Sequence, residues 1–157
     1  MCCKEICNAF NASHECIEGK TLMVSEKGKR FILESPDGSK NTFCCIHVDG
    51  CLIKDLKRRK CDYWFRQCSK ETVPGNYFVE LKGSNIRDGF DQIVSTIQQA
   101  REKGIDLPQK TIRGFIVLGK FKFPKADVTR QTLEDKFEKN HGSKLTIAKN
   151  TYKLVLD

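Results

Sequence analysis

One amphipathic segment in the middle of the chain constrains the fold most, because strand-like segments lie on both sides of it. Its apolar residues recur at helical spacing, and they are Ile86, Phe90, Ile93, Val94 and Ile97. Ser84 or Asn85 can cap this helix. Residues 77–83 precede it as a strand, and residues 111–118 follow it as an almost continuously apolar run. A helix between two strands of one sheet predicts a crossover connection.

The remaining segments predict an α/β (α+β) fold with a mixed sheet flanked by helices. Residues 3–16 have the pattern of a short helix, and residues 128–140 have that of another. Further strands are predicted at residues 21–24, 30–34, 42–48, 61–65, 145–148 and 151–156. The last two form a closing β-hairpin. A chain of 157 residues fits one domain, with a core of about residues 1–120 and a C-terminal helix and hairpin in residues 121–157.

Two charged side chains stand out in the strand before the central helix. Alternation along residues 77–83 places Glu80 and Lys82 on one face together with Phe78. A strand with apolar neighbours is a costly place for charge unless something binds there. The alternative is a surface strand on which Lys82 forms a cross-strand salt bridge with Asp62.

Hairpin geometry brings further acidic residues toward this pair. Residues 69–75 fit the loop between the two strands, so Asp62 lies roughly opposite Lys82 or Glu80. The turn after the preceding strand places Asp49 beside Asp62 by the same reasoning. Three carboxylates and one lysine are therefore predicted to converge.

Such a cluster suits a hard divalent cation, Mg²⁺ or Mn²⁺. These ions prefer oxygen ligands, so the carboxylates of Asp62, Glu80 and Asp49 can bind one together with a substrate phosphate oxygen. Phosphodiester cleavage uses the cation to offset developing charge and to lower the pKa of an attacking water. Lys82 can orient or deprotonate that water.

Asp62 followed by Glu80-Leu81-Lys82, with a helix straight after, resembles the motif of the PD-(D/E)xK nuclease superfamily, which includes restriction enzymes and Holliday-junction resolvases. The resemblance covers roughly residues 42–100. It implies a restriction-endonuclease-like αβββαβ core, one or two Mg²⁺ ions and hydrolysis of nucleic acid. It also implies that Asp62 and Glu80 are metal ligands and that Lys82 is the catalytic lysine.

Three details of the resemblance concern single residues. No proline precedes Asp62, which is a common variation in the superfamily. The first-helix glutamate of the superfamily has two candidates here, Glu5 and Glu15, and the alternative for each is an exposed helix residue. Gln92 resembles the helix glutamine near the metal site of some exonuclease-like members, although helical spacing turns it away from the apolar stripe.

The charge of the chain favours a polyanionic partner. Lys and Arg number 28 against 20 Asp and Glu, which gives a net charge of +8. One cluster is predicted to contact the nucleic-acid backbone: Lys54, Lys57, Arg58, Arg59 and Lys60. Ser84 is expected to contact phosphate at the start of the central helix. DNA is favoured over RNA as the partner, and the alternative for the basic cluster is a solubilising hairpin tip.

Nine cysteines are scattered over the chain without a paired CxxC motif. With no segment apolar enough to cross a membrane and no signal peptide, we expect a cytoplasmic protein with reduced core thiols. Zinc is a second possibility for one group, although its spacing is irregular for a structural zinc site: Cys2, Cys3, Cys7, His14 and Cys16.

Two classes of function follow from these features. The first is a Mg²⁺-dependent endonuclease or exonuclease, and cutting both strands of a duplex favours a homodimer. The second is a catalytically inactive nuclease-fold domain that binds nucleic acid or a protein partner. Divalent-ion binding at Glu80 separates the two classes.

Overall fold

The computed structural model describes residues 3–13, 16–68, 73–82, 85–119 and 128–156, except for the side chains of Lys82 and Val128. The described elements are, in order, α1 (Lys4–Ala9), β1 (Cys16–Gly19), β2 (Thr21–Glu26), β3 (Lys29–Glu34), β4 (Phe43–His47), β5 (Tyr63–Gln67), β6 (Asn76–Lys82), α2 (Ile86–Glu102), β7 (Ile112–Leu118), α3 (Val128–His141), β8 (Leu145–Lys149) and β9 (Thr151–Val155). The chain is an α+β protein with a mixed sheet and a few helices, as predicted at this level.

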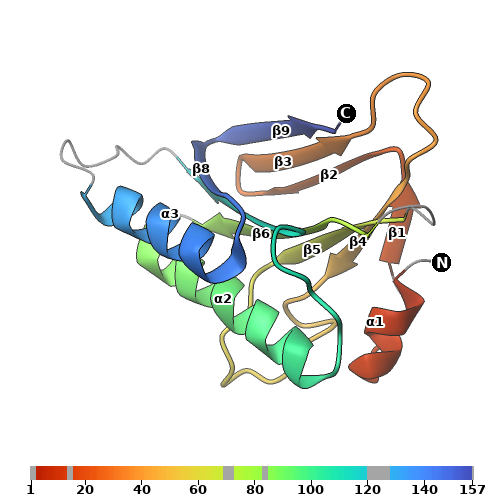
Figure 1. Cartoon of the computed structure of the whole chain (residues 1–157), viewed down its shortest axis with the longest axis horizontal. Helices are drawn as coiled ribbons and strands as arrows, with labels where there is room; N and C mark the ends of the chain where they lie inside the picture. The colour runs from red at the N-terminus through yellow and green to blue at the C-terminus, as the bar shows by residue number, and fades with distance from the viewer. Residues whose placement is uncertain (1–2, 14–15, 69–72, 83–84, 120–127, 157) are drawn as a thin grey trace.

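Six strands form the larger sheet, in the order β1-β4-β5-β6-β7-β8 (Figure 1). Neighbours from β1 to β6 pair antiparallel, whereas β6, β7 and β8 pair in parallel. The parallel steps run through helices, because α2 lies between β6 and β7 in the chain and α3 lies between β7 and β8. The crossover predicted around the central helix is confirmed.

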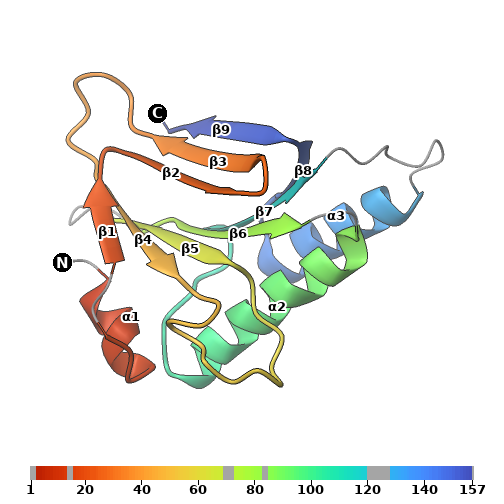
Figure 2. The same ribbon diagram turned by 180° about the vertical axis from the view of Figure 1, so that it is seen from behind.

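A second sheet has the order β2-β3-β9, in which β2 is antiparallel and β9 parallel to β3. Figures 1 and 2 show this sheet stacked over one face of the larger sheet, with α2 and α3 on the opposite face. The larger sheet is therefore the middle of three layers and is covered on both faces.

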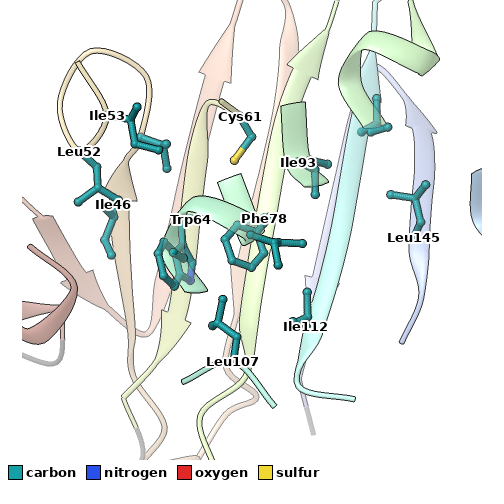
Figure 3. Packing of buried hydrophobic residues seen from close by; sticks show 14 of the residues in the cluster. Ile46, Leu52, Ile53, Cys61, Trp64, Phe78, Ile93, Leu107, Ile112 and Leu145 are labelled. Carbon is teal, nitrogen blue, oxygen red and sulfur yellow. The ribbon is translucent and has the colours of Figure 1, made fainter. Parts of the chain in front are cut away.

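Two apolar clusters fill the spaces between these layers. Trp64 and Phe78 belong to the cluster on the helix side, where Figure 3 shows them next to each other. Phe31 and Phe115 belong to the cluster between the two sheets, with ring centroids 4.8 Å apart. Side chains alternate along a strand, so Phe78 faces the helices and the adjacent Val79 faces the second sheet.

The N-terminal helix is shorter than predicted. α1 ends at Ala9, and Cys16 begins β1 at the edge of the larger sheet, so a helix over residues 3–16 is wrong. Asn11 has a left-handed backbone (φ 53°), which ends the helical path. β1 then pairs with β4, with Cys16 opposite Ile46. His14 and Glu15 lie outside the described residues.

The predicted C-terminal hairpin is wrong, although both of its strands exist. β8 pairs with β7 in the larger sheet, whereas β9 pairs with β3 in the second sheet. Only Asn150 separates the two strands, and hairpin loops need at least two residues. With φ 65°, Asn150 donates from its amide to the Leu118 carbonyl (2.7 Å) and accepts from the Arg30 amide (2.8 Å). It thereby carries the chain from one sheet to the other.

Candidate active site

Asp62 lies just before β5, which begins two residues later than the strand predicted from the sequence. Its amide donates to the Val79 carbonyl on β6 (3.2 Å), which continues the antiparallel pairing of the two strands. Its side-chain Oδ2 accepts a hydrogen bond from the Leu81 amide (2.9 Å). These two bonds fix the Asp62 carboxylate against β6. Of the two cross-strand neighbours that the sequence allows, the register selects Glu80.

Glu80 is buried on β6, with 2% of its surface exposed. It alternates with Val79 and Leu81, which belong to the cluster between the sheets, so Glu80 faces the helices. Burial, and then the nearby charge of Glu80, raise the pKa of the Cys61 thiol. The acidic group and this thiol are therefore close neighbours under α2. Buried carboxylates are costly in isolation and are common where a site holds a cation.

Polar side chains of α2 form hydrogen bonds with residues 59–61, the segment just before Asp62. The Cys61 amide donates to Thr96 Oγ1 (2.8 Å). The Arg59 carbonyl accepts from Ser95 Oγ (2.7 Å) and from Gln99 Nε2 (2.8 Å). Together these contacts hold the start of β5 at a fixed place along the helix.

Sequence reasoning missed this attachment. Thr96 and Gln99 are both buried, yet they interrupt the apolar stripe of α2 as polar residues three positions apart. Two buried polar residues on one helix face need partners, and neighbouring backbone groups satisfy them here. Polar residues inside the apolar face were the signal that could have predicted a docked segment.

A surface pocket of about 240 Å³ lies between α2 and the basic loop, which we define as residues 54–60. Asp49, Gln92 and residues 56–60 line it. Gln92 Oε1 is buried and has no hydrogen-bond partner among the described residues. Buried amide oxygens are normally satisfied, so this atom is a ready acceptor for a cation or a ligand donor. Two predicted site residues, Asp49 and Gln92, therefore line the same pocket as the basic loop.

Lys60 differs from the other predicted nucleic-acid contacts of the basic loop. Its side chain is only 8% exposed, and its ammonium donates to the carbonyls of Asp55 (2.7 Å) and Arg58 (3.1 Å). The same ammonium lies 3.9 Å from Asp49 Oδ1. Lys60 therefore holds the loop together from inside and places a positive charge beside the pocket.

The remaining basic residues lie at the surface. Arg58 pairs with Glu102 on α2 (3.2 Å), and Arg59 lies 3.5 Å from Asp88 near the start of that helix. These exposed pairs contribute little to stability and can exchange partners with a ligand. Lys54 and Lys57 are exposed as well.

The three predicted carboxylates do not gather tightly. Among the described residues, the only group of three or more metal-ligating side chains with ligand atoms within 4.8 Å of one another is Cys3, Cys16 and Cys44. Asp49 lies beyond the end of β4 and forms an isolated bridge with Ile53, so it faces the basic loop. The Lys82 backbone pairs with Leu118 in the sheet. The Lys82 side chain and all of Ser84 lie outside the described residues.

Comparison of the chain with protein-family models, with curated proteins and with solved structures found no match. None of the helices in the described part of the chain combines the length and the apolar character needed to cross a membrane.

Proposed function

We propose that this chain is a Mg²⁺-dependent nuclease that hydrolyses phosphodiester bonds in DNA. The observation that carries the proposal is the hydrogen bond from the Leu81 amide to Asp62 Oδ2 (2.9 Å), which holds one acidic side chain beside the buried Glu80. Two carboxylates are thus placed by neighbouring strands rather than by a mobile loop. Sites on rigid elements position reactive groups more accurately than sites on loops do.

The order of elements around this pair also supports the proposal. β4, β5 and β6 pair antiparallel in sequence order, and β7 returns parallel to β6 after α2. Three further strands, β1, β2 and β3, stand between α1 and β4, and without them the order of elements is the αβββαβ that the resemblance implies. Glu80 lies on β6, and Asp62 lies one residue before β5.

Mg²⁺ and Mn²⁺ prefer oxygen ligands, which the proposed site would supply through the carboxylates of Asp62 and Glu80. Gln92 Oε1, on the wall of the pocket that Asp49 also lines, is a further oxygen acceptor with no described partner. When bound, the cation neutralises charge on the phosphate and makes water a better nucleophile. Lys82 assists by orienting the attacking water, and the basic loop holds the flanking phosphates.

The test is cleavage of supercoiled plasmid, linear duplex, single-stranded DNA and RNA by the full chain in Mg²⁺ or Mn²⁺. The decisive variant is Asp62→Asn, because an amide oxygen can still accept from the Leu81 amide while the negative charge is removed. Asp106→Asn, an exposed position in the segment after α2, is the matched control. We expect metal-dependent cutting of DNA that Asp62→Asn and Lys82→Ala abolish and that Asp106→Asn keeps.

Two other outcomes would contradict the proposal. Cutting that survives in Asp62→Asn excludes this site as its source. A folded protein that cuts none of the four substrates, yet binds DNA with strong salt dependence, supports the inactive nucleic-acid-binding domain instead.

A further inference from the structure

Three cysteine sulfurs from distant parts of the chain meet beside α1. The Sγ atoms of Cys3, Cys16 and Cys44 all lie within 4.8 Å of one another, although the residues are 13 and 28 positions apart. Cys3 and Cys44 are fully buried, and Cys16 is partly exposed. The cluster therefore has a solvent-facing side through Cys16.

Strand pairing explains how two of these sulfurs meet. β1 and β4 are antiparallel, with Cys16 opposite Ile46 and Glu18 opposite Cys44. Cys16 and Cys44 are thus diagonal neighbours on one face of the strand pair, a spacing within reach of side-chain contact. Cys44 belongs to the helix-side cluster, so both face α1.

Helix α1 supplies the third sulfur, from Cys3, and carries a further cysteine, Cys7. Cys3 is the N-cap residue of α1, and the Cys7 amide donates to the Cys3 carbonyl (3.0 Å) one turn later. Residues four apart share one helix face, so Cys3 and Cys7 both look toward the strands. Cys7 is 2% exposed and its thiol is free.

The surroundings make these thiols poor nucleophiles. Burial, followed by the charge of Glu18 and the proximity of Cys7, raises the pKa of Cys44 to about 12. Burial also raises the pKa of Cys7. A reactive or redox-sensing cysteine needs an accessible sulfur, and the Cys3 and Cys44 side chains are fully buried. The cluster therefore fits a structural role better than a catalytic one.

We propose that Cys3, Cys16 and Cys44 bind a Zn²⁺ ion in the reduced protein and so lock α1 onto β1 and β4. Thiolates prefer soft or borderline cations, and Zn²⁺ sites hold four ligands in a tetrahedron. Cys7, on the same face of α1, is the described residue best placed to give the fourth. This site uses sulfur ligands and lies away from the Asp62 and Glu80 pair, so it does not depend on the proposed nuclease activity.

In the structure, Cys3 and Cys16 are in their oxidised form, joined by a disulfide, so the expectation of reduced core thiols is wrong for this pair. That form leaves Cys44 buried beside the bond as a free thiol. A water-soluble phosphine and water reduce the disulfide to two thiols, and the phosphine leaves as its oxide. Zn²⁺ then replaces the thiol proton of each cysteine that binds it, and these protons are released to solvent.

The experiment starts from full-length protein purified with the phosphine reductant and without chelator. Elemental mass spectrometry is expected to find about one zinc ion per chain, and Co²⁺ exchanged into the site is expected to give sulfur-to-metal charge-transfer absorption. Cys44→Ala should lose both signals. Cys45→Ala is the matched control, because this next residue on β4 is also buried but belongs to the cluster on the other face.

A measurement on the unmutated chain covers the case in which Cys44→Ala does not fold. Native protein is alkylated with iodoacetamide, with zinc present or chelated, and labelled residues are mapped by mass spectrometry. Cys16, on β1, is the residue to follow because it is partly exposed. Cys51, also partly exposed and in the loop after β4, is the internal reference. We expect zinc to protect Cys16 at least tenfold without changing Cys51.

Three results would overturn the proposal. One is a reduced, folded chain that contains no zinc and binds no Co²⁺. Another is metal retained by a folded Cys44→Ala variant, or lost equally by Cys45→Ala. The last is a Cys16 labelling rate that zinc does not change.

Discussion

The sulfur cluster of Cys3, Cys16 and Cys44 and the acidic pair of Asp62 and Glu80 lie in the same helix-side layer, but they are assembled in different ways. The acidic pair comes from β6 and from the residue before β5, 18 residues apart in the sequence. The sulfur cluster joins α1, the edge strand β1 and β4, and two of its three members are fully buried.

This difference matches the chemistry that each group can support. Hard cations such as Mg²⁺ keep several waters and exchange ligands with substrate, so their sites need an open side. Structural zinc sites are closed by four protein ligands and contribute directly to folding. Removing Mg²⁺ from the acidic pair should therefore abolish activity, whereas removing zinc from the sulfur cluster should lower the free energy of unfolding.

Removal of zinc should have the largest effect on stability. A site occupied at a hundred times its dissociation constant adds about 3 kcal/mol to the free energy of unfolding, and a zinc-selective chelator removes that contribution. Denaturant titrations of the reduced protein, with and without the chelator, measure the loss. The comparison fails if Mg²⁺ removal lowers the stability by a similar amount, or if zinc removal leaves it unchanged.

Glu80→Gln should abolish function while sparing the fold. We expect cleavage to fall by at least about 100-fold, because even residues behind the metal ligands cost 10- to 100-fold when changed. The metal-free variant should still fold, since Gln fills the buried position of Glu80 at nearly equal volume. Cleavage rates and thermal melts in Mg²⁺ and in EDTA provide both readouts, with the exposed Glu138→Gln as the control. A variant that unfolds would instead assign Glu80 a structural role.

The sequence predicts the strands and the helix around the acidic pair well because their information is local. Alternation along β6, the apolar stripe of α2 and the apolar run of β7 are each contained in one segment, and all three elements are confirmed. The placement of Asp62 followed from one hairpin, whose sequence left two opposite neighbours open, Lys82 and Glu80. The observed register selects Glu80. Its bond to the Leu81 amide needed the structure, because Asp62 lies just outside the ladder.

The sulfur region could not be predicted in the same way. Phe43, Cys44, Cys45 and Ile46 are all buried, since the larger sheet is covered on both faces. Such a run has no polar alternation to tell which cysteine faces α1, so Cys44 was missed as a partner of Cys3 and Cys16. The destination of β9 was missed for a related reason: pairing between strands distant in sequence leaves no local pattern.

Gln92→Ala should have a moderate effect on activity and almost none on stability. Gln92 Oε1 makes no hydrogen bond with the described residues, so the fold loses little when it is removed. If it contacts the cation or its water, cleavage should fall about tenfold, as for other groups around metal sites. Gln98→Ala, an exposed position on the same helix, is the matched control. Equal cleavage by the two variants would remove Gln92 from the site.

Lys57→Ala should have the smallest effect, and it tests which side of the molecule meets nucleic acid. Lys57 is exposed on the basic loop beside the pocket, whereas Lys4 is exposed on α1 beside the sulfur cluster. Each phosphate contact contributes about 0.9 to the slope of log affinity against log salt. Lys57→Ala should therefore reduce that slope by about one, and Lys4→Ala should leave it unchanged. DNA-binding titrations over a series of salt concentrations measure both slopes. If Lys4→Ala reduces the slope and Lys57→Ala does not, the nucleic acid binds on the side of the sulfur cluster, and the basic loop does not hold it for cleavage at the acidic pair.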